Sequence, residues 1–282
     1  MSDSNKKTKL IVICGPTATG KTAKSIQIAK DIDGEVISAD SRQIYKHMDI
    51  GTAKVTADEM AGVPHYMLDI AEPNQKFSVA EYKKMVQNII TDIHTRGKTP
   101  ILIGGTGMYI DAVIYNRDFP EVPPDPKLRS ELENMSTYDL YNILAELDVE
   151  RAETIDKDNP VRLIRAIEIA KALGGVPKQE QTESPYDLEI HYMDRPDDEL
   201  KKRIHDRNIS RLDSGLVEEI ENLHNNHNVS WKRMDELGLE YRYVSQFIQG
   251  EIETKEKLIE ILDQKTWQYV KRQRTWFKKY LK

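Results

Sequence analysis

The apolar positions in the first 115 residues alternate between short continuous runs and stretches with helical spacing. The continuous runs predict strands, at 9–15, 34–40 and 99–105. Apolar residues spaced by three and four predict helices, at 21–32 and 78–97. Ser78 and Glu81 form a capping box at the start of the second helix. Strands that alternate with helices predict an α/β fold, with a parallel sheet flanked by helices.

A cluster of four prolines between 120 and 126 ends this alternation and marks a domain boundary. From there to about residue 180 the spacing is helical, and Pro160 and a Gly-Gly pair bound the last helix. The apolar run 188–194 then predicts a strand that returns to the sheet. We therefore expect a discontinuous core formed by residues 9–116 and 187–282. A small helical domain, residues 117–186, is inserted between its two parts.

The formal net charge of −6 hides an uneven distribution. Residues 116–200 hold 21 acidic against 10 basic residues, whereas the rest of the chain holds 31 basic and 26 acidic residues. The stretch 265–282 has seven basic residues, five aromatic ones and no acidic one. As a helix, it would align a basic ridge suited to a nucleic-acid backbone, formed by Lys271, Arg274, Lys278 and Lys282. Alternatively, the aromatic side chains dock this helix on the core and the lysines stay in water.

Other features narrow the class of protein. The sequence has no apolar run of about 18 residues, and its start, MSDSNKK, lacks the apolar segment of a secretory signal, so we expect a cytoplasmic protein without a membrane span. Cys14, the single cysteine, lies in the first predicted strand, where we expect a buried structural thiol. His224 and His227 have a spacing found in metal sites, but the absence of neighbouring carboxylate or cysteine ligands favours a solvated loop.

The motif GPTATGKT, residues 15–22, lies between the first predicted strand and the first predicted helix. The pattern G-x-x-x-x-G-K-T is typical of the P-loop of nucleotide-binding, and especially ATP-binding, proteins. Its backbone N–H groups and helix N-terminus bind phosphoryl oxygens, with Lys21 as a cation and the Thr22 hydroxyl for Mg²⁺. The loop recognises the phosphoryl oxygens and not the organic group attached to them. A nucleoside triphosphate and another kind of diphosphate therefore both remain possible ligands.

Two further motifs follow predicted strands, DSRQIY from Asp40 and GGTGMY at 104–109. Because the carboxyl ends of parallel strands meet at one edge of a sheet, we expect both motifs to converge on the P-loop. Asp40 alone could be a helix N-cap, an outer ligand of Mg²⁺ or a base. The glycines around Thr106 could permit close packing, but we favour the interpretation that they leave room for a ligand.

A stripe of arginines, Arg203, Arg207 and Arg211, recurs every four residues on one face of a predicted helix, with Leu200, Ile204 and Leu212 on its packing side. Such a stripe is commonly a solvated surface. If the helix lies opposite the P-loop, an arginine fork could clamp a leaving diphosphate.

Together these motifs resemble the tRNA dimethylallyltransferase family, also called tRNA isopentenyltransferases. The matching segments run from residue 10 to 277 and are GPTATGKT, ISADSRQIYKHMDIGTAK, VPHYMLDI, FSVAEY, GKTPILIGGTGMYI, DNPVRLIRAIEI, RIHDR with SGLVEEI, and KRQRTWF. The resemblance implies a P-loop NTPase-like core that transfers a dimethylallyl group from dimethylallyl diphosphate to an adenosine of tRNA. The acceptor is the exocyclic amine of the adenosine immediately 3′ of the anticodon, in tRNAs reading codons that begin with U. The P-loop would then hold an isoprenoid diphosphate.

The resemblance also implies roles for individual residues. Asp40 is the general base, while Arg207, Lys21 and Thr19 act on the diphosphate. The diphosphate site is Gly15, Pro16, Thr17, Ala18, Thr19, Gly20, Lys21 and Thr22, with Mg²⁺ near Thr22. Contacts to the tRNA anticodon stem-loop are implied for Asp40, Ser41, Arg42, Gln43, Thr106, Arg129, Arg162 and Arg165. We expect the last three to face the RNA while the carboxylates of the inserted domain face water, and we expect a monomer.

Alternatives remain open at this stage. The segment GLEYR at 238–242 departs from a GYKE-like segment of many family members, which leaves its part in RNA binding undecided. A P-loop kinase of a small metabolite could use Asp40 or Asp69 as Mg²⁺ ligand or base, but it gives no role to the basic C-terminal stretch. A prenyltransferase of free adenine nucleotides would not need an RNA surface either. A non-enzymatic RNA-binding module would leave Lys21, Asp40 and Arg207 without a role.

Overall fold

The computed structural model describes residues 7–178 and 183–281. The chain folds into two compact units, one formed by Met1–Asn116 with Thr182–Lys282 and the other by Arg117–Gln181. The first unit contains the sheet, and the second contains helices only among its described residues.

The sheet is parallel, as predicted, and its five strands lie in the order β3-β2-β4-β1-β5. The strands are β1 Thr8–Cys14, β2 Gly34–Ala39, β3 His65–Tyr66, β4 Thr99–Gly104 and β5 Tyr186–Tyr192. In the register of the central pairs, Ile11 of β1 lies opposite Ile101 of β4 and Glu189 of β5. The pattern of apolar runs did not predict β3, because a strand of two residues is too short to show a period.

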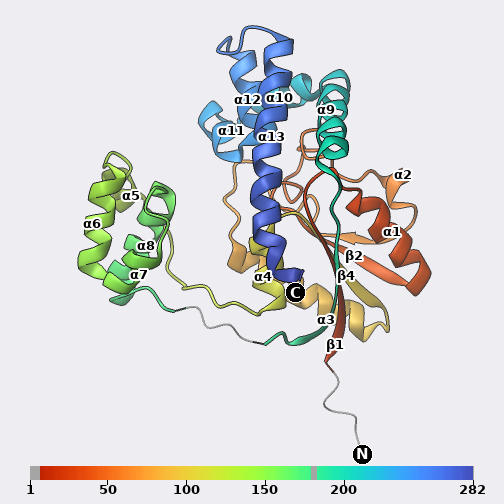
Figure 1. Cartoon of the computed structure of the whole chain (residues 1–282), viewed down its shortest axis with the longest axis horizontal. Helices are drawn as coiled ribbons and strands as arrows, with labels where there is room; N and C mark the ends of the chain where they lie inside the picture. Colours follow the sequence, from red (N-terminus) through yellow and green to blue (C-terminus); the bar gives the residue numbers. More distant parts are fainter. Residues whose placement is uncertain (1–6, 179–182, 282) are drawn as a thin grey trace, which may run out of the picture. The chain divides into compact units, whose positions relative to one another are not determined.

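The helices of the first unit fall into two groups (Figure 1). Those inserted between the strands are α1 Lys21–Ile32, α2 Ala57–Met60, α3 Val79–Thr95 and α4 Gly107–Ile114. Those after β5 are α9 Asp197–Asp213, α10 Leu216–Asn225, α11 Trp231–Leu237, α12 Leu239–Ile248, α13 Lys255–Phe277 and the short 3₁₀ helix Lys278–Tyr280. The long helix α13 packs beside α9 and α12 and reaches α4 (Figure 1).

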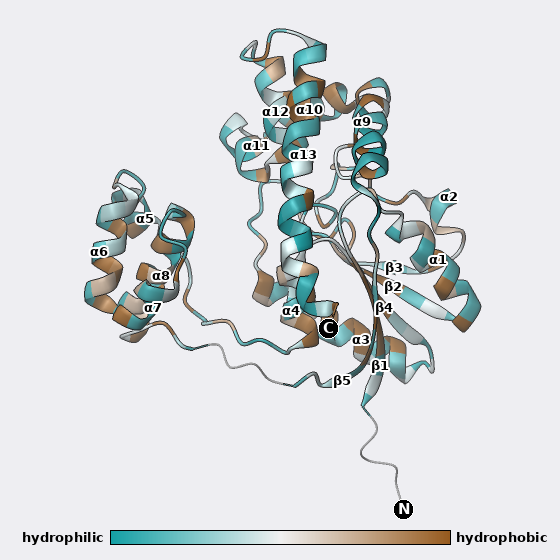
Figure 2. Cartoon of the chain, viewed as in Figure 1, coloured by the Kyte–Doolittle hydropathy of each residue, from teal (hydrophilic) through white to brown (hydrophobic). Residues whose placement is uncertain are grey.

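Both faces of the sheet are covered, which explains why its central strands β1 and β4 are mostly apolar. Side chains of α1 pack on one face, against Ile11, Ile13 and Ile101. Helices α3 and α4 and Phe277 of α13 pack on the other face. Apolar residues mark α4, whereas α9 is mainly hydrophilic (Figure 2). Cys14 is fully buried, and burial raises the pKa of its thiol to about 12, which confirms a structural role.

The helices after β5 form a second core with the loop that follows β2. Ile44, Tyr45 and Met48 of this loop pack against Leu216, Ile220 and other buried residues of α10 to α13. The packing matters for function because this same loop begins at Asp40.

The second unit consists of α5 Pro126–Leu132, α6 Thr137–Leu147, α7 Val149–Thr154 and α8 Pro160–Leu173. Helix α8 begins and ends as its sequence predicts. The Asn159 side chain accepts the N–H of Arg162, and Gly174 ends the helix at φ 78°, which glycine adopts without a Cβ clash. The unit has its own apolar core, which includes Leu140, Leu144 and Leu163.

Glu35, a buried carboxylate at the start of β2, contributes to the stability of the fold through its hydrogen bonds. Glu35 is 2% exposed, and it accepts hydrogen bonds from Arg96 at 2.6 and 2.7 Å and from the Tyr66 hydroxyl at 2.8 Å. The hydrogen bonds from Arg96 are the largest cause that lowers the pKa of Glu35 from 4.5 to about 2. Because this pKa is depressed in the folded state, the stabilisation is present above pH 4.5 and is lost as the pH falls towards 2.

We therefore expect Glu35→Gln to lower the free energy of unfolding by roughly 1–3 kcal/mol at neutral pH, because a buried donor loses its acceptor. Asp92→Asn removes the other, 63% exposed partner of Arg96 and should change stability by less than about 0.5 kcal/mol. Denaturant unfolding at neutral and acidic pH measures both. Equal losses in the two variants, or a loss at Glu35 that persists below its pKa, would contradict the assignment.

Candidate active site

The P-loop joins β1 to α1 and depends on two glycines with positive φ. Gly15 has φ 141°, and a Cβ there would lie 2.0 Å from the backbone oxygen of Met193. Gly20 has φ 93° and lies directly before α1. A side chain at either position would strain the loop, and at Gly15 it would also collide with the segment after β5.

Two side chains of the loop bind its own backbone. The Thr19 hydroxyl, 1% exposed, donates to the Pro16 carbonyl at 2.9 Å, and Lys21 Nζ donates to the same oxygen at 2.6 Å. Thr19 therefore shapes the loop through its hydroxyl. Burial lowers the pKa of Lys21 to about 8, although the Asp40 carboxylate counteracts this. An incoming anion would relieve the cost of keeping this ammonium group buried.

Three arginines contact consecutive residues of the loop. Arg207 Nη1 donates to the Thr17 hydroxyl at 2.7 Å. Arg203 Nε donates to the Ala18 carbonyl at 2.7 Å, and Arg195 Nε donates to the Thr19 carbonyl at 3.0 Å. The stripe on α9 is therefore no mere solvated surface, since two of its arginines reach the P-loop. Arg195 was missed, because nothing local distinguishes it from other charged residues.

Asp40 begins the loop after β2 and uses one carboxylate oxygen structurally. Its Oδ1 accepts the backbone N–H of Arg42 at 2.8 Å and that of Gln43 at 3.3 Å. Such bonds from an aspartate to the following backbone form an Asx turn. Among the described residues no hydrogen-bond partner is found for Oδ2. No helix begins at Asp40, so the N-cap alternative is wrong; the turn occupies one oxygen and leaves the other for chemistry.

Two cavities of the first unit meet at Asp40. The loop cavity, about 410 Å³, is lined by Lys21, Thr22 and neighbouring residues of the P-loop. The rim cavity, about 440 Å³, is lined by residues of α12 and α13. Both are lined by Thr17, Asp40, Thr52, Arg207 and Tyr269. A ligand in one cavity can thus meet a ligand in the other beside Asp40 and Arg207.

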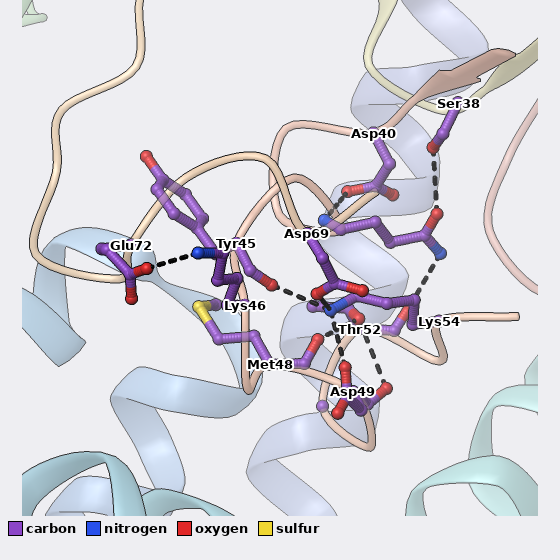
Figure 3. Close-up of polar contacts among 12 residues, drawn as sticks. Ser38, Asp40, Tyr45, Lys46, Met48, Asp49, Thr52, Lys54, Asp69 and Glu72 are labelled. Carbon is purple, nitrogen blue, oxygen red and sulfur yellow. Dashed lines mark hydrogen bonds and ion pairs between the residues drawn. The ribbon is translucent and has the colours of Figure 1, made fainter. Parts of the chain in front are cut away.

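The residues that follow Asp40 are held by internal hydrogen bonds. The backbone N–H of Ser41 donates to the Thr106 hydroxyl at 3.1 Å, and Arg42 Nε donates to the Leu237 carbonyl at 2.7 Å. The Gln43 amide accepts from the Ser38 hydroxyl at 3.0 Å and donates to the Thr52 carbonyl (Figure 3). The structure thus brings the predicted motifs after β2 and β4 together beside the P-loop.

Lys54 and Asp69 form a structural ion pair next to the loop that follows β2. Lys54 Nζ donates to Asp49 and Asp69, both at 2.6 Å, and to the Tyr45 carbonyl (Figure 3). The Lys54 side chain is only 6% exposed. Asp69 is therefore occupied with folding its own loop, which weighs against its use as the base or Mg²⁺ ligand of a kinase.

The glycines after β4 make room for α13. A Cβ on Gly105 would lie 2.4 Å from Gln273 Nε2, and one on Gly107 would lie 2.3 Å from the Trp276 ring. At Gly107 the prediction of room for a ligand is therefore wrong, and close packing is its role. Gly104 and Gly105 both line the loop cavity, although Gly105 also packs against Gln273.

The basic face of α13 differs from the predicted ridge. Lys265, Gln268, Tyr269 and Arg272, spaced by three and four, line the rim cavity. Arg274 instead binds Asp194 at 3.0 Å and Asp197 at 2.6 Å. The ridge fails at this residue because the acidic start of α9 packs against it; Lys282 lies outside the described residues.

The divergent segment 238–242 lies at the rim cavity. Glu240 accepts a hydrogen bond from Arg211 at 2.6 Å, and both side chains are nearly buried. Arg211 therefore supports the cavity wall, although it belongs to the same stripe as Arg207. The Tyr241 hydroxyl donates to Glu219, whose carboxylate also accepts the N–H groups of residues 49, 50 and 51.

Within the second unit, two predicted RNA contacts bind a buried carboxylate. Glu168, with a 1% exposed side chain, accepts from Arg129 at 2.7 Å and from Arg165 at 3.1 Å. The expectation that the carboxylates of this unit face water is wrong for Glu168, because these two arginines compensate its burial. Arg162 is 54% exposed and pairs with Asp156.

Neither a metal cluster nor a membrane-spanning helix is found in 7–178 and 183–281. His224 stacks on Trp231 with a 3.8 Å centroid separation, and His227 stacks on His47 at 4.0 Å. The predicted loop is therefore wrong at His224, which lies in the last turn of α10, whereas His227 lies in the turn that follows this helix.

Comparisons with known proteins agree over nearly the whole chain. The model of the IPP transferase family matches residues 43–280. A tRNA dimethylallyltransferase of Exiguobacterium sp. is 39% identical over 277 residues, covering 97% of this chain and 88% of that protein. The tRNA isopentenylpyrophosphate transferase of Bacillus halodurans superposes with a TM-score of 0.69 at 39% identity, over 96% of this chain and 87% of that one. A eukaryotic dimethylallyltransferase acting on tRNA superposes with a TM-score of 0.80 at 27% identity, over 96% of this chain and 70% of that one.

Proposed function

The chain belongs to the IPP transferase family, and we propose that it is a tRNA dimethylallyltransferase with its reaction centre at Asp40. It transfers the dimethylallyl group of dimethylallyl diphosphate to the exocyclic amine of the adenosine immediately 3′ of the anticodon, in tRNAs reading codons that begin with U. Diphosphate leaves. The observation that supports the proposal is that Asp40 and Arg207 line both cavities, one of them bounded by the P-loop.

The loop cavity takes the donor. Backbone N–H groups of residues 18–22 bind the diphosphate, and Lys21 and Arg207 neutralise the charge that grows on the bridging oxygen as the allylic bond breaks. Thr22 lines this cavity, and its hydroxyl is a hard oxygen donor that would hold Mg²⁺. The bound ion would supply further electrostatic stabilisation of the leaving diphosphate.

The rim cavity takes the adenosine. Its exocyclic amine is a weak nucleophile because the lone pair is delocalised into the ring. Oδ2 of Asp40 accepts the amine proton as the new carbon–nitrogen bond forms. Entry of the base from one side and the donor from the other keeps water from the allylic carbon, which would otherwise be hydrolysed.

Residues around the rim cavity and residues of the helical insertion bind the tRNA. Ser41, Arg42, Gln43 and Thr106 form a rigid edge beside Asp40. Exposed Arg162 is available for a phosphate contact, while Arg129 and Arg165 hold the insertion together through Glu168 and contact RNA with their remaining N–H groups. The tRNA substrate supports a cytoplasmic location.

The function is tested with unmodified tRNA, Mg²⁺ and labelled dimethylallyl diphosphate. Label should become covalently bound to the tRNA adenosine while diphosphate is released. Label that moves only to water or to free adenine nucleotides would overturn the proposal. Cleavage of ATP that depends on a small metabolite would favour the kinase instead.

The basic face of α13 leads to a prediction about salt dependence. Lys265→Ala/Arg272→Ala should weaken tRNA binding at low salt and reduce the slope of log affinity against log salt concentration by about two, since each residue neutralises one phosphate. Lys84→Ala/Lys257→Ala, a charge-matched control at exposed positions that line neither cavity, should leave the slope unchanged. If Lys271→Ala/Lys278→Ala has the larger effect, the ridge predicted from sequence binds the RNA instead.

A further inference from the structure

One buried amide of α13 connects the two loops that form the reaction centre. Gln273 is 5% exposed. Its Oε1 accepts the backbone N–H of Thr17 in the P-loop at 3.0 Å, and its Nε2 donates to the Gly105 carbonyl after β4, also at 3.0 Å. A side-chain amide suits this position because it carries one acceptor and two donors on neighbouring atoms.

The hydrogen bonds continue from Gln273 to Arg207. The backbone of Thr17 is held by Gln273, and its hydroxyl accepts from Arg207 Nη1 at 2.7 Å. Arg207 lies among the cations Arg203 and Arg211, and burial together with these neighbours lowers its pKa. Its position therefore depends on a fixed acceptor. On the other side, Gly105 precedes Thr106, whose hydroxyl accepts the N–H of Ser41 beside Asp40.

We propose that Gln273 is a positioning residue that sets Arg207 against the diphosphate by holding Thr17, and that it keeps the P-loop in register with the Asp40 loop. The inference rests on the proposed function. Gln273 takes no part in bond making: it turns the Thr17 N–H away from the ligand and fixes the Thr17 hydroxyl. Loss of this contact lets Arg207 shift, and misplacement by about 1 Å can cost about 10²-fold in rate.

The test uses full-length Gln273→Met, which keeps the length of the side chain and removes both hydrogen bonds. We expect the single-turnover transfer rate at saturating donor to fall about 10- to 100-fold, with tRNA affinity within about twofold of wild type. Gln264→Met, at an exposed position on the same helix, should match wild type. A rate for Gln273→Met within about threefold of wild type overturns the proposal.

A double-mutant cycle separates positioning from general loss of structure. Thr17→Val removes the hydroxyl that Arg207 contacts and keeps the backbone N–H. If Gln273 acts through this contact, the double variant should be no more than about threefold slower than the slower single variant. Additive losses overturn the proposal, because they place the effect of Gln273 elsewhere.

A second variant covers the case in which Gln273→Met does not fold. Gly105→Ala should displace the amide from the opposite side, because its Cβ would lie 2.4 Å from Nε2, and no positive φ opposes alanine there. It should reproduce the loss in rate at unchanged tRNA affinity; a normal rate overturns the proposal. Wild-type protein that transfers no label to tRNA at all would refute the proposed function instead, which keeps the two failures distinguishable.

Discussion

Asp40→Asn is expected to slow dimethylallyl transfer by about 10² or more while tRNA and donor still bind. Asparagine keeps an oxygen that can accept the N–H groups of Arg42 and Gln43, so the turn after β2 should persist. What is lost is the oxygen that can take a proton from the amine. Single-turnover assays with labelled donor measure the rate, and filter binding measures tRNA affinity.

Asp69→Asn provides the matched control, because the backbone of Asp69 bonds to Gln43 of the Asp40 loop while its carboxylate is paired with Lys54. It should transfer at a rate close to wild type even if it melts at a slightly lower temperature. An Asp40→Asn enzyme with normal turnover would remove Asp40 as the base. A loss confined to Asp69→Asn would revive the kinase interpretation.

The second large effect is expected at Arg207. Arg207→Met should reduce the transfer rate by about 10²–10³, comparable to removing one donor to a developing anion. Its melting temperature should equal or exceed that of wild type. Burial, and after it the neighbouring Arg211 and Arg203, lower the pKa of the Arg207 guanidinium, so a neutral side chain of similar length removes a buried charge from the free enzyme.

Lys202→Met serves as control for this prediction, since Lys202 is 77% exposed on the same helix. It should change neither rate nor stability measurably. If Arg207→Met both transfers normally and melts earlier, Arg207 is a structural residue of α9 and the diphosphate is bound by Lys21 without it.

Elements whose signals are local were predicted correctly. Ser78 and Glu81 form the capping box of α3, because a cap depends only on residues within one helical turn. Gly174 ends α8 for the same kind of reason. The P-loop was also predicted correctly, since its two glycines and its lysine lie within eight consecutive residues.

Contacts across long stretches of chain were not predicted. Gln273 meets Thr17 over a separation of 256 residues, and Arg195 meets Thr19 over 176. Nothing in the neighbouring sequence distinguishes Gln273 from the exposed Gln264 on the same helix. The error at Gly107 has the same origin, because only the packing of α13 shows that the Trp276 ring fills the space beside it.

The sequence by itself determined the parallel sheet, the phosphate-binding loop and the carboxylate that follows β2, since period, caps and glycine backbone geometry are properties of neighbouring residues. The tertiary structure alone decided which charges serve the site. Arg207 reaches the P-loop, Arg211 binds Glu240 and Arg274 binds Asp194, although sequence spacing treats such arginines alike. The physical reason is that a charge takes its role from the partners that burial brings within hydrogen-bonding distance, and the packing of α9 and α13 supplies those partners.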